Sequence, residues 1–227
     1  MSRSHLTRWS LVLGAARGEN ERREDFARQY ANVIASYFAA RWRLPIDHER
    51  VGDATQDVFV QCFKDGGALE RVEPDRPGGF RAYLFGVASN VSLMMERRFA
   101  RLRKSERGES VVDLAHVEQD AATLSQTFDR AWAAMIAREA RRLLAERAMD
   151  DERAAERFRC LEMQYSGGLP PRTIAARLGI PATQVYERLR EARIAFRAAL
   201  LEVLREQSPG STRAELEESC KELAGLL

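Results

Sequence analysis

Arginine side chains gather in one stretch of this sequence, and they are the residues best suited to chemistry. Six arginines and two glutamates lie between Pro171 and Leu201, a local excess of four positive charges. Arginine pairs with phosphate oxygens and with the edge of guanine, so the cluster favours nucleic acid as a partner. The net charge of the whole 227-residue chain is only +2, so such a surface has to come from local clustering.

The same stretch has the apolar spacing of two short helices joined by a tight turn. Ile174 and Leu178 are four residues apart and share one helix face. Gly179 suits the left-handed residue that ends a helix, and Pro181 suits the start of the next. This pattern predicts a helix-turn-helix, and its alternative is a helical hairpin with a solvated charged face. The apolar stripe of the second helix consists of Val185, Leu189, Ala192 and Phe196.

The polar face of this second helix is the candidate surface for reading DNA. Residues near the start of such a helix reach base edges in the major groove. Gln184 is suited to adenine, and Arg190 is suited to guanine or to phosphate. The candidate DNA contacts of the helix-turn-helix are Arg172, Arg177, Thr183, Gln184, Tyr186, Glu187, Arg188, Arg190 and Arg193.

A second basic segment ends a helix predicted from residue 80 to about residue 103. Arg97, Arg98 and Arg101 lie near that end, and further basic residues follow. Cations at this position suit the helix dipole, and they equally suit contacts with the DNA backbone. Aromatic residues at the start of the helix could stack on unpaired bases or belong to a core, and for Phe80 and Phe85 the core is favoured.

Helical periodicity recurs along the chain while alternating strand patterns are scarce, so the expected fold class is all-α. Residues 105–127 are acidic and aperiodic, which indicates an inter-domain linker or, alternatively, a long surface loop. Two small helical domains are expected at residues 1–104 and 128–205, with a tail helix in residues 206–227. The other helices are expected near residues 7–17, 23–43, 49–63, 80–103, 128–147 and 152–165, and on both sides of Gly179.

Several classes of protein are excluded by what the sequence lacks. The cysteines Cys62, Cys160 and Cys220 are far apart and form no CxxC pair, which argues against disulfides and structural zinc. There is no glycine-rich phosphate loop, no paired histidines and no nucleophile elbow, so we expect no enzyme and no cofactor. No apolar run approaches about 20 residues and no signal peptide opens the chain, so a cytoplasmic protein without a membrane partner is expected.

Several segments together resemble the extracytoplasmic-function (ECF) sigma factors, which carry two helical domains on a flexible linker. Residues 53–59, DATQDVF, resemble the D-L-V-Q-E-V-F segment of sigma region 2. Residues 80–91, FRAYLFGVASNV, resemble F-R-A-W-L-Y-x-I-A-R-N-V of the same region. Residues 174–181 and 188–193 are similar to region 4, the helix-turn-helix. The opening TRWSLVL is similar to a planctomycete-type subgroup, and the resemblance spans residues 7–204.

The resemblance implies an alternative sigma factor that initiates transcription at specific promoters. Asp53, Gln56 and Asp57 would bind core RNA polymerase, which offers its β′ and β subunits as partners. The helix-turn-helix would recognise the −35 element of promoter DNA, and an anti-sigma factor is a further candidate partner. A stand-alone helix-turn-helix regulator, acting without polymerase, is the alternative. The residues that would recognise and melt the −10 element are Arg81, Tyr83, Asn90, Arg97, Arg98 and Arg101.

The sequence also departs from the family pattern at a few positions. The run before Gln56 is less acidic than in many relatives, which suggests weak polymerase docking. Phosphorylation of Thr55 by a Ser/Thr kinase would restore negative charge there, and a silent helix residue is the alternative. Met94 stands where an aspartate is common, so a local polar contact is expected to be missing, and Pro170 replaces a serine helix cap. The tail from Ser211 would pack on the second domain or regulate access to DNA.

Overall fold

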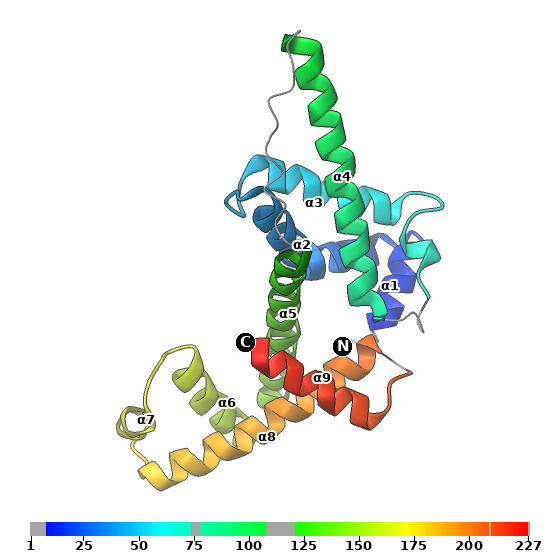
Figure 1. Ribbon diagram of the computed structural model, residues 1–227. Coiled ribbons are helices and arrows are strands. Elements are labelled where there is room, and N and C mark those ends of the chain that lie inside the picture. Colours follow the sequence, from blue (N-terminus) through cyan, green and yellow to red (C-terminus); the bar gives the residue numbers. More distant parts are fainter. Residues whose placement is uncertain (1–7, 74–77, 108–120, 209, 227) are drawn as a thin grey trace. The chain divides into compact units, whose positions relative to one another are not determined.

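The computed structural model describes residues 8–73, 78–107, 121–208 and 210–226 (Figure 1). Within these ranges the chain forms nine α-helices, one short 3-10 helix and no strand, which confirms the all-α prediction. The elements are α1 (Arg8–Ala16), α2 (Asn20–Trp42), α3 (Glu49–Phe63), η1 (Leu69–Arg71), α4 (Gly79–Arg107), α5 (Ala121–Asp150), α6 (Glu152–Tyr165), α7 (Pro171–Leu178), α8 (Ala182–Gln207) and α9 (Arg213–Leu226).

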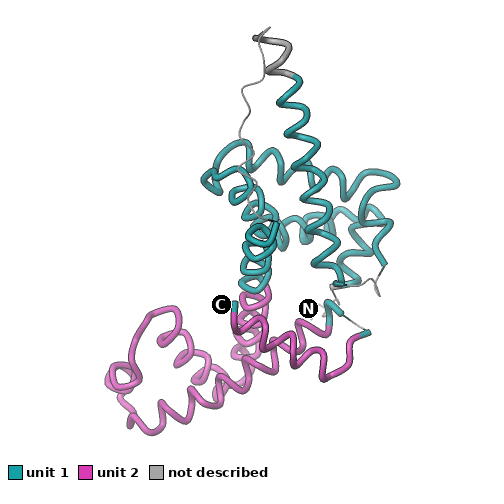
Figure 2. The backbone as a smooth tube through the Cα atoms, viewed as in Figure 1, with its two compact units in different colours: residues 1–135, 206–210, 226–227 teal, residues 136–205, 211–225 magenta. Residues whose placement is uncertain are grey.

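The backbone divides into two compact units (Figure 2). The first comprises Met1–Met135 with Glu206–Gly210 and Leu226–Leu227, and the second comprises Ile136–Arg205 with Ser211–Gly225. The boundary between these units lies inside α5, whereas the predicted domains were residues 1–104 and 128–205. Helix α4 continues to Arg107 and α5 already begins at Ala121. Both ends of the predicted linker are therefore helical, and its middle, residues 108–120, lies outside the described residues.

Aromatic packing explains why the first part of α5 belongs to the first unit. The ring of Phe128 lies edge-on to Phe85 of α4, with centroids 5.4 Å apart. The ring of Trp132 stacks on Tyr30 of α2 at 5.5 Å. Phe128 and Tyr30 are almost completely buried. Aromatic pairs of this kind contribute about 0.5–1.5 kcal/mol beyond the burial of their area. These contacts hold residues 128–135 against α2 and α4, which the sequence did not indicate.

The ends of α1 and α3 are joined by one arginine of α2. The Nε of Arg23 donates to the carbonyl oxygen of Ala15 at 3.1 Å, and its Nη2 donates to that of Phe63 at 2.8 Å. Its guanidinium also lies over the Phe63 ring, 5.3 Å from the centroid. The last carbonyl groups of a helix have no partner within the helix, so Arg23 satisfies acceptors that would otherwise need water.

The helix-turn-helix of the second unit is formed by α7 and α8 around a small apolar core. Gly179 has φ 65° and ends α7, which confirms the predicted left-handed residue. Ile180 is half-buried and packs against this core. Pro170 provides no side-chain hydrogen bond at the start of α7, so the predicted loss of a cap is also confirmed. The buried core residues are Cys160, Ile174, Ala175, Val185 and Leu189.

The last helix, α9, packs as part of the second unit, apart from its final residue. Its buried side chains are Leu216, Cys220 and Leu223, which occur at the i, i+4 and i+7 positions of one face. Leu226 is only half-buried, and Leu227 lies outside the described residues. Of the two roles considered for the tail, the packing role therefore has direct structural support.

The reactivity of the three cysteine thiols provides a simple chemical test of this fold. Cys62, Cys160 and Cys220 are all buried and unpaired. Burial raises the pKa of the Cys62 thiol to about 12, and it also raises the pKa of Cys160. Because the thiolate is the reactive species, we expect Cys62 in the native protein to react on the order of a thousandfold more slowly than in urea. A thiol reagent at pH 8, with the labelled peptide identified by mass spectrometry, measures this ratio. Equal rates would contradict the packing of α3.

Candidate nucleic-acid interface

The exposed face of α8 carries most of the predicted −35 contacts. Thr183, Gln184, Tyr186, Glu187 and Arg190 are all exposed. Val185 and Leu189, buried at 0% and 1% exposure, anchor the opposite side of the same turns. From Thr183 to Arg190 the helix rises about 10 Å, which is within the width of about 12 Å of a major groove. The first two turns of α8 therefore present a polar surface of the size that a DNA groove accepts.

Helix α7 contributes two exposed arginines beside this face. Arg172 lies in its first turn and Arg177 in its last turn, and both side chains are exposed. In helix-turn-helix proteins the first helix crosses the DNA backbone, so cations at these positions are suited to phosphate oxygens. Both side chains are accessible to a phosphate, and their contact with DNA stays a prediction.

Arg188 lies differently from the prediction. Its Nη2 forms an ion pair with the Oε2 of Glu156 on α6 at 2.9 Å, and only 23% of its side chain is exposed. The neighbouring Glu191 is paired in the same way, with Arg157 of α6 at 3.4 Å. A carboxylate beside the guanidinium largely cancels its charge at short range. Arg188 therefore holds α6 against α8, and it is poorly placed for the DNA contact expected of it.

Two of the predicted −10 contacts are likewise engaged inside the first unit. Arg81 forms an ion pair with Asp129 of α5, and the hydroxyl of Tyr83 donates to the carbonyl oxygen of Ala68. Both side chains are half-buried. The aromatic residue at the start of the same helix, Phe80, is 5% exposed and confirms its prediction as a core residue. Arg81 and Tyr83 thus stabilise the position of α4 rather than offering a surface for DNA.

The other −10 candidates form an exposed stripe along α4. Asn90, Arg97 and Arg101 follow one another at i, i+7 and i+11, which places them on one helix face, and Arg98 is exposed beside them. Leu93 and Met94 are exposed at 39% and 46% between the amide and the arginines. The stripe combines hydrogen-bonding, apolar and cationic groups, which is the mixture that contacts with bases and backbone require.

The predicted polymerase-binding face lies on α3. Asp53 and Gln56 are exposed and Asp57 is half-buried. Val60, one turn further, is 54% exposed and extends this face with an apolar side chain. The geometry leaves both carboxylates accessible to a basic partner surface.

Arg50, a basic residue three positions before Asp53, is partly withdrawn from solvent. Its guanidinium lies over the ring of Phe99 at 4.5 Å and over the ring of Trp42 at 5.4 Å. Cation–π contacts of this kind fix the position of the cation on aromatic surfaces. The rings fix the position of this guanidinium but do not cancel its charge, so a positive charge remains in the first turn of α3.

The environment of Thr55 argues against the hypothesis that it is phosphorylated. Its side chain is buried, with 9% exposure, and its hydroxyl donates to the carbonyl oxygen of Val51 at 2.8 Å. A kinase needs the hydroxyl in solvent, and a phosphate would bring close to two negative charges into the core of the first unit. The folded protein therefore does not offer Thr55 for modification.

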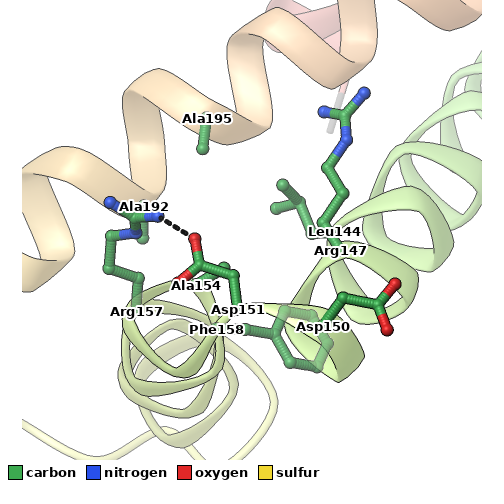
Figure 3. A pocket seen from close by; sticks show the side chains of 9 residues that line it. All are labelled: Leu144, Arg147, Asp150, Asp151, Ala154, Arg157, Phe158, Ala192 and Ala195. Atoms are coloured by element: carbon green, nitrogen blue, oxygen red, sulfur yellow. Dashed lines mark ion pairs between the residues drawn. The ribbon is translucent and has the colours of Figure 1, made fainter.

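A cavity of about 400 Å³ lies in the second unit where α5, α6 and α8 meet (Figure 3). Leu144, Phe158 and alanines form its apolar walls. Arg157 at its edge pairs with Asp151 at 3.7 Å, and Arg147 pairs with Glu202. Since both arginines are already matched by carboxylates, the cavity offers an anionic ligand little unbalanced charge.

Among the described residues no three histidines, cysteines or acidic side chains come together in an arrangement that could hold a metal ion. None of the helices in the same ranges combines the length and the apolar character needed to cross a membrane.

Comparisons with protein-family models, with curated proteins and with solved structures find no match to this chain. Its function is therefore inferred from the geometry above and from the resemblance of the individual motifs.

Proposed function

We propose that this protein is an alternative sigma factor of the ECF type. In this proposal the acidic face of α3 binds core RNA polymerase and the exposed stripe of α4 contacts the −10 element. The helix-turn-helix binds the −35 element as duplex. The proposal rests on three separate exposed surfaces that occur in one chain and in this order. The chemistry of each surface fits one of the three partners.

Each surface is held by residues that leave its functional side chains in solvent. On α3, Val51, Ala54, Val58 and Cys62 are buried while Asp53 and Gln56 point outward. A stand-alone regulator would need the helix-turn-helix of α7 and α8 but would have no use for an acidic face on α3. The engagement of Arg81 and Tyr83 in packing is the observation that favours this second candidate, because it reduces the DNA-binding surface of α4.

Co-elution with core RNA polymerase separates the two candidates. We expect the full chain to co-elute with the core enzyme and to direct transcription from a cognate promoter. The double variant Asp53→Lys/Asp57→Lys should weaken co-elution by about tenfold or more, because like charges would face a basic partner surface. A matched control is Glu21→Lys/Glu24→Lys, which makes the same charge change at two exposed positions of α2.

Two outcomes would contradict the proposal. One is a wild-type protein that does not co-elute with the core enzyme, and the other is an equal loss of binding in both double variants. A protein that dimerises and binds a palindromic duplex without polymerase would instead support the stand-alone regulator.

A further inference from the structure

Arg193 differs from the paired arginines of the second unit in the kind of partner it has. Its Nε donates to the hydroxyl oxygen of Tyr165 at 3.1 Å, and its Nη2 donates to the Oε1 of Gln164 at 3.2 Å. Both partners stand at the C-terminal end of α6, and Arg193 itself is exposed. A guanidinium has five N–H groups, so three remain for another acceptor.

The neutrality of these two partners is what makes the arrangement informative. Arg188 and Arg157 contact α6 or α8 through carboxylates, which compensate their charge. A phenol and an amide orient a guanidinium without cancelling its positive charge. Arg193 is therefore held in one direction while its charge remains available to an anion.

The position of Arg193 on α8 indicates which anion it would meet. It lies seven residues after Tyr186, on the same side of the helix, and ten residues after Thr183. Ten residues correspond to a rise of about 15 Å, which exceeds the width of about 12 Å of the major groove. When the first turns of α8 enter the groove, Arg193 reaches the level of the strand that borders it, where phosphates are the available acceptors.

We propose that Tyr165 and Gln164 are positioning residues that hold Arg193 toward a backbone phosphate of duplex DNA. This inference rests on the proposed function only in requiring that the helix-turn-helix binds duplex. A free arginine side chain loses about 2 kcal/mol of rotamer entropy when it is fixed. The hydrogen bonds from Arg193 to Tyr165 and Gln164 already restrict its side chain in the free protein, so less rotamer entropy is lost when DNA binds. The phosphate contact becomes stronger without any new contact between Tyr165 and DNA.

The test measures binding of the full chain to a labelled 20-base-pair duplex of mixed sequence over a range of NaCl concentrations. Arg193→Gln should reduce the slope of log K against log salt by about 0.9, because one phosphate contact is lost. Tyr165→Phe keeps the charge of Arg193, so the slope should stay unchanged while affinity falls about three- to tenfold. In the Arg193→Gln background, Tyr165→Phe should have no further effect.

Arg205→Gln is the matched control, since Arg205 is exposed on the same helix and lies twelve residues beyond Arg193. It should bind as the wild type does, and equal melting temperatures of all variants establish that the second unit stays folded. Unchanged affinity of Tyr165→Phe, or additive losses in the double variant, would overturn the positioning role while leaving the helix-turn-helix proposal intact. Absence of salt-dependent duplex binding by the wild type would overturn the duplex-binding role itself.

Discussion

Gly67→Ala is expected to destabilise the first unit by about 3 kcal/mol, at the upper end of what overpacking usually costs. A Cβ at Gly67 would lie 2.8 Å from the carbonyl oxygen of Cys62 and 3.0 Å from that of Gln61, and it would also collide with the carbonyl oxygen of Lys64. These atoms belong to the backbone at the end of α3, so no side-chain rotation can relieve the overlap. The chain itself would have to move.

A shift at Gly67 would also disturb the turn that follows it. Ala68 donates its backbone N–H to the carbonyl oxygen of Gln61 at 2.9 Å, and its own carbonyl oxygen accepts the hydroxyl of Tyr83. Leu69, the next residue, is 1% exposed. The effect of the substitution should therefore extend to the packing of η1 and to the start of α4.

Tryptophan fluorescence during urea unfolding measures this loss selectively, because Trp9, Trp42 and Trp132 all belong to the first unit. Gly86→Ala is the control. It lies inside α4, and outside its own helix backbone no atom lies within 4 Å of the position that a methyl group would take. Alanine there should stabilise the helix by about 0.5–1 kcal/mol. An unfolding midpoint of Gly67→Ala equal to that of the wild type would show that the turn after α3 can accept a side chain.

Local sequence patterns predicted the helices and the turn of the helix-turn-helix well, because those features depend on neighbours in the chain. The spacing of Ile174, Leu178 and Gly179 contains the information needed for α7 and its left-handed end. The burial of Thr55 could also have been predicted from the spacing of apolar residues. Thr55 lies four residues after Val51 and three before Val58, so the spacing of the buried residues of α3 already placed it on the apolar face.

Hydrophobic periodicity could not predict ion pairs between residues that are distant in the sequence. The ion pair between Arg81 and Asp129 joins residues 48 positions apart, and the pair between Arg188 and Glu156 joins two helices that the sequence treats separately. A helical pattern predicts which side chains of a single helix are exposed to solvent. It does not predict which exposed arginines form an ion pair with a carboxylate of another helix. Only the arginines without such a carboxylate keep an uncompensated charge for DNA.

Glu96 is the second residue at which a substitution should have a large effect, and it too was invisible in the sequence. Its two carboxylate oxygens accept hydrogen bonds from the Nε and Nη2 of Arg41, both at 3.0 Å, and Oε1 also accepts one from the Nε1 of Trp42 at 2.9 Å. The polar contact expected to be missing beside Met94 is thus supplied two residues further on. The hydrogen bonds to Glu96 raise the pKa of Arg41.

Glu96→Ala is expected to cost about 2–3 kcal/mol of the stability of the first unit, since it leaves three N–H donors on two half-buried side chains without their acceptor. The side chains of Arg41 and Glu96 are only 24% and 22% exposed, so water replaces the lost bonds incompletely. The loss should be visible in the same urea titrations. It should also weaken the binding of DNA by the arginines that follow on α4, because Glu96 fixes that part of α4 to the end of α2.

The double variant Arg41→Met/Glu96→Leu distinguishes a structural ion pair from a general need for a charged residue on α4. Removing both partners leaves only the indole N–H of Trp42 without its acceptor, and the new apolar side chains retain packing volume, so the double variant should be more stable than Glu96→Ala. If Glu96→Ala and the double variant lose the same free energy of unfolding, the bond to Trp42 dominates and Arg41 contributes little. If neither loses stability, then Glu96 does not hold α4 to the end of α2, and the arginine stripe of α4 does not depend on it for its position.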